Sequence, residues 1–300
     1  MADQNQLELE RAPVTSDDVH GFDGSPKTIL VHIQDDETLD VRIETALSLA
    51  RSFSAHVECL HVTPSQAYVA YDSLGGVFVM PDVIKAIEEG EAEIRSKIES
   101  KLANEDVNWN YNQVTGDVAS QLISRAALAD LLVTSRAPIR ADFVGSTIGL
   151  LGDLICRSRT PVLIPGDGGR PCDPTKAALI AWDGSYEAAN AVRSSIGMLK
   201  RASSVHVLQI VEEKAEFFPS TRLLEYLSQH GIHAELTIEN VDAVEYADLI
   251  PEILVTRAKG VNAGYMVMGG YNHSRLGEFV FGGVTRTMLS ASPVPILIVR

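Results

Sequence analysis

The chain has 300 residues, of which 45% are hydrophobic and 22% charged, a balance typical of folded globular proteins. This length favours about two domains of roughly 150 residues each. The formal net charge of −15 would repel nucleic-acid phosphates and an anionic membrane, so we expect neither nucleic acid nor membrane among the partners.

The first half reads as alternating strands and helices after an acidic start. Residues 1–25 carry six acidic side chains against one base, Arg11, and predict a flexible acidic tail. A buried strand is expected at 27–33, and Leu, Ile and Ala spaced three and four apart predict a helix from Leu39 to about Phe53. The remaining elements expected in this half are a strand at 56–62, a helix at 82–103 and strands at 130–134 and 161–164.

The same series then restarts, which predicts an internal repeat. The apolar run at 176–182 corresponds to 27–33 at an offset of 149 residues, and 204–210 corresponds to the second strand at an offset of 148. The runs at 264–268 and 295–298 correspond to the last two strands of the first half, both at an offset of 134. A constant offset over the last strands is strong support for duplication.

Alternating strands and helices predict an α/β protein with parallel sheets covered on both faces. We expect an acidic tail at 1–25, a first domain at 26–165, a turn-rich linker at 166–175 and a second domain at 176–300. The last strand of each half is an apolar edge that needs cover. The two halves are therefore expected to pair there as a built-in dimer, and further homodimerisation stays open.

Cysteine content and the first residues of the chain predict a soluble cytoplasmic protein. Cys59, Cys156 and Cys172 form no CxxC pair and no metal-ligand spacing, which suits a reducing compartment. We see no basic and apolar signal peptide, and no apolar run approaches the roughly 18 residues of a membrane span. No metal site is expected.

One block carries most of the chemistry. Val267-Met268-Gly269-Gly270 leads from a strand into a glycine turn, and Phe281-Gly282-Gly283 follows a polar loop and opens a helix-like segment. Backbone N–H groups at such a strand-to-helix junction can bind an anion such as a phosphate.

The second half resembles a universal stress protein domain. Trp182-Asp183-Gly184-Ser185-Tyr186-Glu187-Ala188 resembles the first-strand signature of that family, and Gly269-x-x-Asn272 followed by Gly282-Gly283 resembles its nucleotide motif, G-x-x-G-x9-G-[S/T]. The resemblance implies two tandem Rossmann-like domains, each an open five-stranded parallel sheet with helices on both faces, and a cytoplasmic stress-response role. In ATP-binding members the adenine end lies near the first two strands and the phosphates over the glycine loop. The positions that match are Asp183, Ile210, Met268, Gly269, Asn272, Gly282, Gly283 and Val284.

Two departures from the motif weaken the implied nucleotide site. Asn272 stands at the second motif glycine, where its side chain could crowd a phosphate, although Asn tolerates left-handed backbone angles. Gly283 stands at the closing Ser/Thr and lacks a hydroxyl worth about 1.5–3 kcal/mol, or about ten- to a hundredfold in affinity. Weak ATP binding and its complete loss both remain open.

The first half departs further. At an offset of 134 its motif positions are Ser135, Pro138, Ile148 and Gly149, and Gln34 replaces the first-strand aspartate. Pro138 has no N–H to offer an anion. We expect this half to be a structural partner without nucleotide.

Several side chains have two interpretations. Asp183 could bind a ligand or cap the next helix, and His273 and Arg275 could contact a phosphate or lie in a solvated loop. The histidines at 32, 61 and 206 fall in strand runs, which favours packing over metal binding.

Three functions follow from these patterns. The leading hypothesis is a non-enzymatic stress-response protein with weak adenine-nucleotide binding in the second half and no catalytic residues. The alternatives are a slow ATPase or related α/β nucleotide hydrolase, and a pure protein-interaction module without ligand.

Overall fold

The computed structural model describes residues 24–68, 70–71, 77–78, 81–136, 147–167, 169–211, 218–240, 249–270 and 283–300. The predicted acidic tail, apart from its last two residues, lies outside these ranges.

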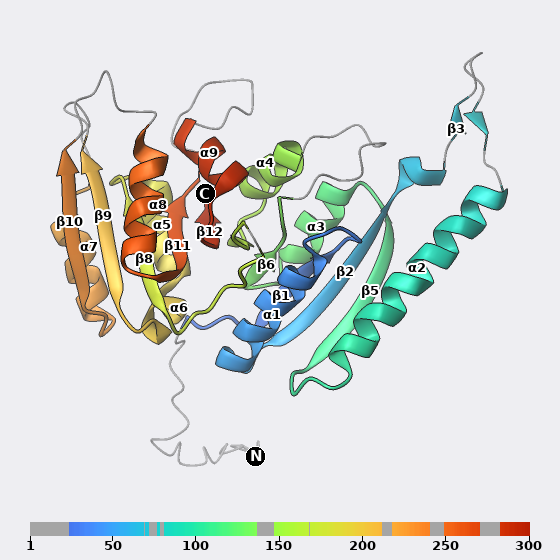
Figure 1. The fold of residues 1–300 in the computed structure, drawn as a ribbon, viewed down its shortest axis with the longest axis horizontal. Helices are drawn as coiled ribbons and strands as arrows, with labels where there is room; N and C mark the ends of the chain where they lie inside the picture. Colours follow the sequence, from blue (N-terminus) through green and yellow to red (C-terminus); the bar gives the residue numbers. More distant parts are fainter. Residues whose placement is uncertain are drawn as a thin grey trace, which may run out of the picture.

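Ten strands form one continuous sheet, five from each half. The strands of the first half are β1 (Thr28–Ile33), β2 (His56–Pro64), β5 (Trp109–Gly116), β6 (Leu131–Val133) and β7 (Val162–Ile164). Those of the second half are β8 (Ala177–Trp182), β9 (Val205–Val211), β10 (Ala234–Asn240), β11 (Ala263–Gly269) and β12 (Ile296–Val299). The sheet runs β10-β9-β8-β11-β12-β7-β6-β1-β2-β5, from β10 at one end to β5 at the other (Figure 1).

The two halves join through their last strands. β12 pairs with β7 in the antiparallel sense, with Ile296 opposite Ile164 and Ile298 opposite Val162. The other pairs within the ten-stranded sheet are parallel. Both joined strands are buried throughout. The predicted pairing of the halves is confirmed, because each apolar edge covers the other.

Helices cover both faces of the sheet. The helices are α1 (Leu39–Phe53), α2 (Pro81–Leu102), α3 (Val118–Ala126), α4 (Thr147–Arg157), α5 (Tyr186–Ser194), α6 (Ile196–Arg201), α7 (Ser220–Gln229), α8 (Ile250–Gly260) and α9 (Gly283–Ala291). Apolar side chains of α1, α2, α5, α6 and α7 form one cluster, and those of α3, α4, α8 and α9 form the other. Alternate residues of a strand serve opposite clusters, as Ile29 and Leu30 of β1 do.

Beyond these elements, a short 3₁₀ helix lies at Ser65–Tyr68, and β3 (Ala70–Tyr71) pairs with β4 (Val77–Phe78). None of the helices in the described ranges is long and apolar enough to cross a membrane.

Within the ten-stranded sheet, two strands have no counterpart in the strand runs read from the sequence, β5 and β10. Both lie at the outer ends of the sheet, and their residues are mostly half-buried or exposed. Polar residues such as Asn110, Asn112 and Glu235 interrupt them, so they lack the apolar run that marks a central strand.

Candidate functional site

Asp183 acts on the start of α5 through Ser185. Its Oδ1 accepts hydrogen bonds from the Ser185 backbone N–H (2.9 Å) and from the Ser185 hydroxyl (2.6 Å). Ser185 Oγ in turn accepts the N–H of Ala188 (3.1 Å) and caps the helix. Gly184 makes the turn between them with φ of +74°. The capping interpretation of Asp183 thus holds in an indirect form, with Ser185 as the cap.

Gly269 lets α5 approach β11 closely. A Cβ at this position would lie 2.5 Å from the backbone nitrogen of Ala188 and 2.8 Å from the carbonyl carbon of Glu187. The backbone of the first turn of α5 therefore packs directly against Gly269. Sequence reasoning assigned this residue to a phosphate loop and missed its packing role, because the contact joins elements far apart in the chain.

The apolar members of the predicted site lie on one face of the sheet. Met268 is part of the cluster formed with α8 and α9, and Ile210 and Val284 pack against the same cluster. Their strands β9 and β11 flank β8, so Asp183, Ile210 and Met268 all stand near the carboxyl edge of neighbouring parallel strands.

Gly283 begins α9 and is exposed. A Cβ added there would meet nothing within 4 Å. The remaining predicted site residues, Asn272 and Gly282, lie outside the described residues, as do His273 and Arg275.

In the first half, a buried arginine lies at the carboxyl edge of the sheet, at the position equivalent to the predicted site of the second half. Arg42 of α1 is fully buried and pairs with Asp36 at 2.8 Å. Its guanidinium also donates to the carbonyl oxygen of Gln34 (2.6 Å), to Thr38 Oγ1 (2.9 Å) and to the hydroxyl of Ser135. Burial lowers the pKa of Arg42, and the adjacent Asp36 opposes that shift.

The two halves therefore use different residues to pack the first helix against the carboxyl edge of the sheet. Gln34 and Ser135 correspond to Asp183 and Gly269, and Arg42 corresponds to Ala191 of α5 at the offset of 149. The second half uses a small helix face laid on a glycine, whereas the first half uses a charged network. The signal for Arg42 in the sequence is a lone cation on the apolar face of α1, a position that usually needs a partner when buried.

The buried histidines have polar partners in the protein. His32 Nδ1 lies 3.3 Å from Thr134 Oγ1, and His61 Nδ1 lies 3.1 Å from the Tyr111 hydroxyl. Burial lowers the pKa of His32 to about 3 and lowers that of His61 as well. Within the described ranges no group of three or more His, Cys, Asp or Glu residues could hold a metal ion.

Comparison with known proteins agrees with this architecture. The family model named Universal stress protein family matches residues 174–300. A universal stress protein from Archaeoglobus fulgidus superposes with a TM-score of 0.70 at 16% identity, covering 92% of this chain and 96% of that one. A functionally unknown protein from Pseudomonas aeruginosa gives 0.56 at 16% identity, covering 92% and 93%. No curated protein matches the sequence significantly.

The two structural likenesses establish the fold across both halves, and the family match identifies the second. Residues 174–300 are thus a universal stress protein domain, joined through β12 and β7 to a first half of the same topology.

Proposed function

We propose that this chain is a cytoplasmic, non-enzymatic stress-response protein of two universal stress domains, at 26–165 and 176–300. The second domain binds an adenine nucleotide weakly and the first serves as its structural partner. The family assignment of residues 174–300 supports the stress-response role.

One observation carries the nucleotide part of the proposal. Ile210, Met268 and Val284 belong to one apolar cluster, and next to Val284 the exposed Gly283 begins α9, where an added Cβ would meet no described atom within 4 Å. Apolar side chains at this edge together with the N–H groups at the start of a helix would suit a ligand with a flat base at one end and phosphates at the other. Asp183, Gly269, Asn272 and Gly282 complete the proposed site.

The first half lacks this combination. Arg42, Asp36 and Ser135 occupy its edge as a closed network. A nucleotide there would have to break a buried ion pair, so we assign binding to the second half alone.

Substitutions of Gly283 test the proposal from both directions. Gly283→Ser restores the hydroxyl that the motif lacks and should tighten Mg-ATP about ten- to a hundredfold. Gly283→Asp should abolish binding, because its carboxylate repels phosphate while remaining favourable for the helix. Titration calorimetry of the full chain measures both. The corresponding Gly149→Asp in α4 is the control and should leave affinity unchanged.

Two results would contradict the proposal. Equal affinity in the two Gly283 variants would remove the nucleotide from this edge. Phosphate release that scales with protein concentration and disappears in Gly283→Asp would replace the non-enzymatic role with a slow hydrolase.

A further inference from the structure

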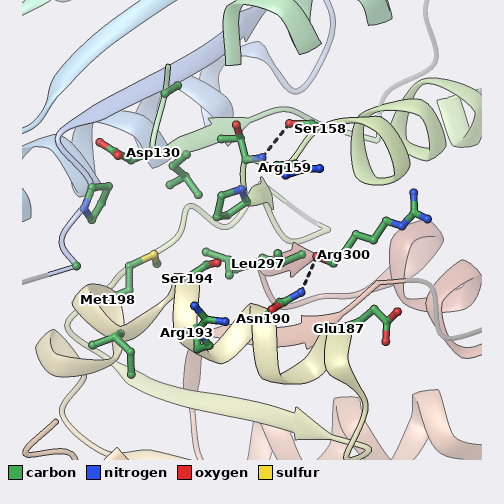
Figure 2. A pocket seen from close by; sticks show the side chains of 18 of the residues that line it. Asp130, Ser158, Arg159, Glu187, Asn190, Arg193, Ser194, Met198, Leu297 and Arg300 are labelled. Carbon is green, nitrogen blue, oxygen red and sulfur yellow. Dashed lines mark hydrogen bonds between the residues drawn. The ribbon is translucent and has the colours of Figure 1, made fainter. Parts of the chain in front are cut away.

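A cleft of about 1420 Å³ opens between the two halves, away from the proposed nucleotide edge. From the second half it is lined by α5, α6 and the end of β12, and from the first half by residues around the starts of β6 and β7. Figure 2 shows Arg159 on one side of it and Asn190 and Arg193 on the other. None of the described members of the nucleotide site lines it.

The cleft is cationic although the chain as a whole is strongly acidic. Among the described residues, five basic side chains line it, against two acidic ones, Asp130 and Glu187. Asp130 is already engaged, because its Oδ2 accepts the N–H groups of Lys27 (2.8 Å) and Thr28 (2.9 Å). The basic residues are Arg157, Arg159, Arg193, Lys200 and Arg300.

Of the four arginines in this set, Arg159 and Arg193 are available for an anionic partner. Arg157 pairs with Asp153 at 3.5 Å, and Arg300 donates to the Cys156 carbonyl at 2.6 Å. Arg159 and Arg193 are exposed and form no ion pair with any residue that the structure describes. Unpaired arginines facing one cavity in an acidic protein favour binding of carboxylates or phosphates.

A peptide segment fills the corresponding groove of the other half. Ser194 of the cleft corresponds to Thr45 of α1, whose Oγ1 accepts the N–H of Cys172 (3.2 Å) from the linker. Ser158 likewise corresponds to Ser292, whose carbonyl accepts the N–H of Asp167 (2.9 Å).

The linker also brings an acid to a base there, since Asp167 lies 3.4 Å from Arg136. The filled groove shows that a peptide segment carrying a carboxylate can occupy such a surface. No segment in the described ranges covers the open cleft in the same way.

The first described residues of the chain lie at this cleft. Gly24, Ser25 and Pro26 line it. A Cβ on Gly197 of α6 would lie 2.3 Å from the Gly24 carbonyl oxygen, which fixes the point of departure against the second half. Asp17, Asp18 and Asp23 precede Gly24 by at most seven residues, a reach of about 24 Å for extended chain.

We propose that the cleft binds the acidic amino-terminal segment of its own chain, residues 1–23, through Arg159 and Arg193. Attachment at Gly24 raises the effective concentration of the acidic residues at the cleft. Charge attraction between exposed groups is screened by salt, so the contact is sensitive to ionic strength. The proposal does not depend on nucleotide binding.

A distance measurement in the full chain tests this. Spin labels are placed at Ser16→Cys and at Leu128→Cys, a 94% exposed rim position between the lining residues Ala127 and Ala129. The native cysteines are buried, and Cys156, which lines the cleft, is replaced by Ala in all samples so that only the two introduced thiols take a label. At low salt we expect a narrow, short distance distribution, which broadens at about 0.5 M salt because the Debye length falls to a few ångströms.

Charge variants separate the cleft from a general electrostatic effect. Arg159→Glu/Arg193→Glu should broaden the distribution, and so should Asp17→Asn/Asp18→Asn/Asp23→Asn, which leaves the described fold untouched. Lys85→Glu/Lys259→Glu is the matched control, since both lysines are exposed and neither lines the cleft.

An unchanged distribution in the cleft variant or in the neutralised segment would overturn the proposal. Binding of a free acidic peptide to the cleft, without any effect on the tail distance, would also overturn it and would assign the cleft to a partner protein.

Discussion

The Arg42 guanidinium and the Asp36 carboxylate lie 2.8 Å apart where the first half closes its carboxyl edge, with Arg42 fully buried and Asp36 10% exposed. Desolvation makes such a pair costly to break, because the remaining charge loses its partner. The pair therefore holds together the start of α1 and the ends of β1 and β6.

Removing one member of this pair should destabilise the protein strongly. Arg42→Met leaves Asp36 without its cation, and we expect a loss of about 3–5 kcal/mol in the free energy of unfolding. Urea denaturation measures it. Arg42→Met/Asp36→Asn should recover much of the loss, whereas Lys97→Met, which breaks an exposed pair with Asp35, should cost at most about 1 kcal/mol. Equal costs for Arg42→Met and Lys97→Met would contradict the buried network.

Gly269 should tolerate no side chain. Gly269→Ala forces the new methyl group against the backbone of α5, and we expect a loss of about 1–3 kcal/mol in unfolding free energy. Gly90 in the middle of α2 is the control, because a Cβ there meets nothing within 4 Å. Gly90→Ala should stabilise the protein by about 0.5–1 kcal/mol, since alanine favours the helix. The same sign for both variants would contradict the packing role of Gly269.

Acid should weaken the protein through His32. Burial lowers the pKa of this histidine to about 3, so the folded state keeps it neutral while the unfolded chain takes up a proton below about pH 6.5. Its contribution is complete above pH 6.5 and declines by about 1.4 kcal/mol per pH unit as the pH falls towards 3.

The variant His32→Asn isolates this effect and can retain a hydrogen bond to Thr134. The stability difference between wild type and variant, from urea denaturation at pH 7 and pH 5, should shift by about 2 kcal/mol in favour of the variant. A difference that is the same at both pH values would mean that His32 does not titrate on unfolding.

The cysteines should react in a fixed order. Burial raises the pKa of all three thiols, that of Cys59 to about 12 and that of Cys172 further, but Cys156 lines the cationic cleft, where Arg300 opposes the shift. At pH 8 a pKa of 12 lowers the thiolate fraction by roughly a thousandfold relative to a free thiol. A colorimetric thiol reagent should modify Cys156 first, and all three thiols quickly after denaturation. Equal native rates would contradict the burial of Cys59 and Cys172.

The sequence predicts the frame of this fold well, because central strands and amphipathic helices carry periodic apolar signals. The helix expected from Leu39 to about Phe53 has those bounds in the structure, and the expected helix at 82–103 spans Pro81–Leu102. The pairing of the halves could be predicted because the last strand of each half is short and apolar, and only the other half can bury it. β5 and β10 are not predicted, because outer strands expose many of their side chains to solvent and carry polar residues instead of an apolar run.

The site is less accessible to sequence reasoning, because its contacts join distant elements. No pattern in the neighbouring sequence indicates that Gly269 packs against Ala188. In the same way, none indicates that Arg42 bonds to Ser135, 93 residues away. The assignment of nucleotide to Asp183, Ile210, Met268, Gly269, Asn272, Gly282, Gly283 and Val284 stays a prediction.

The single antiparallel junction between β12 and β7 relates the halves by an approximate two-fold axis. A single polypeptide crosses such an axis only once, so one connecting segment cannot serve both of the grooves that the axis relates. Fusion of two similar domains thus breaks the symmetry that a dimer of separate domains would keep. One side is closed by covalent connection, and the other is free to evolve a surface of its own.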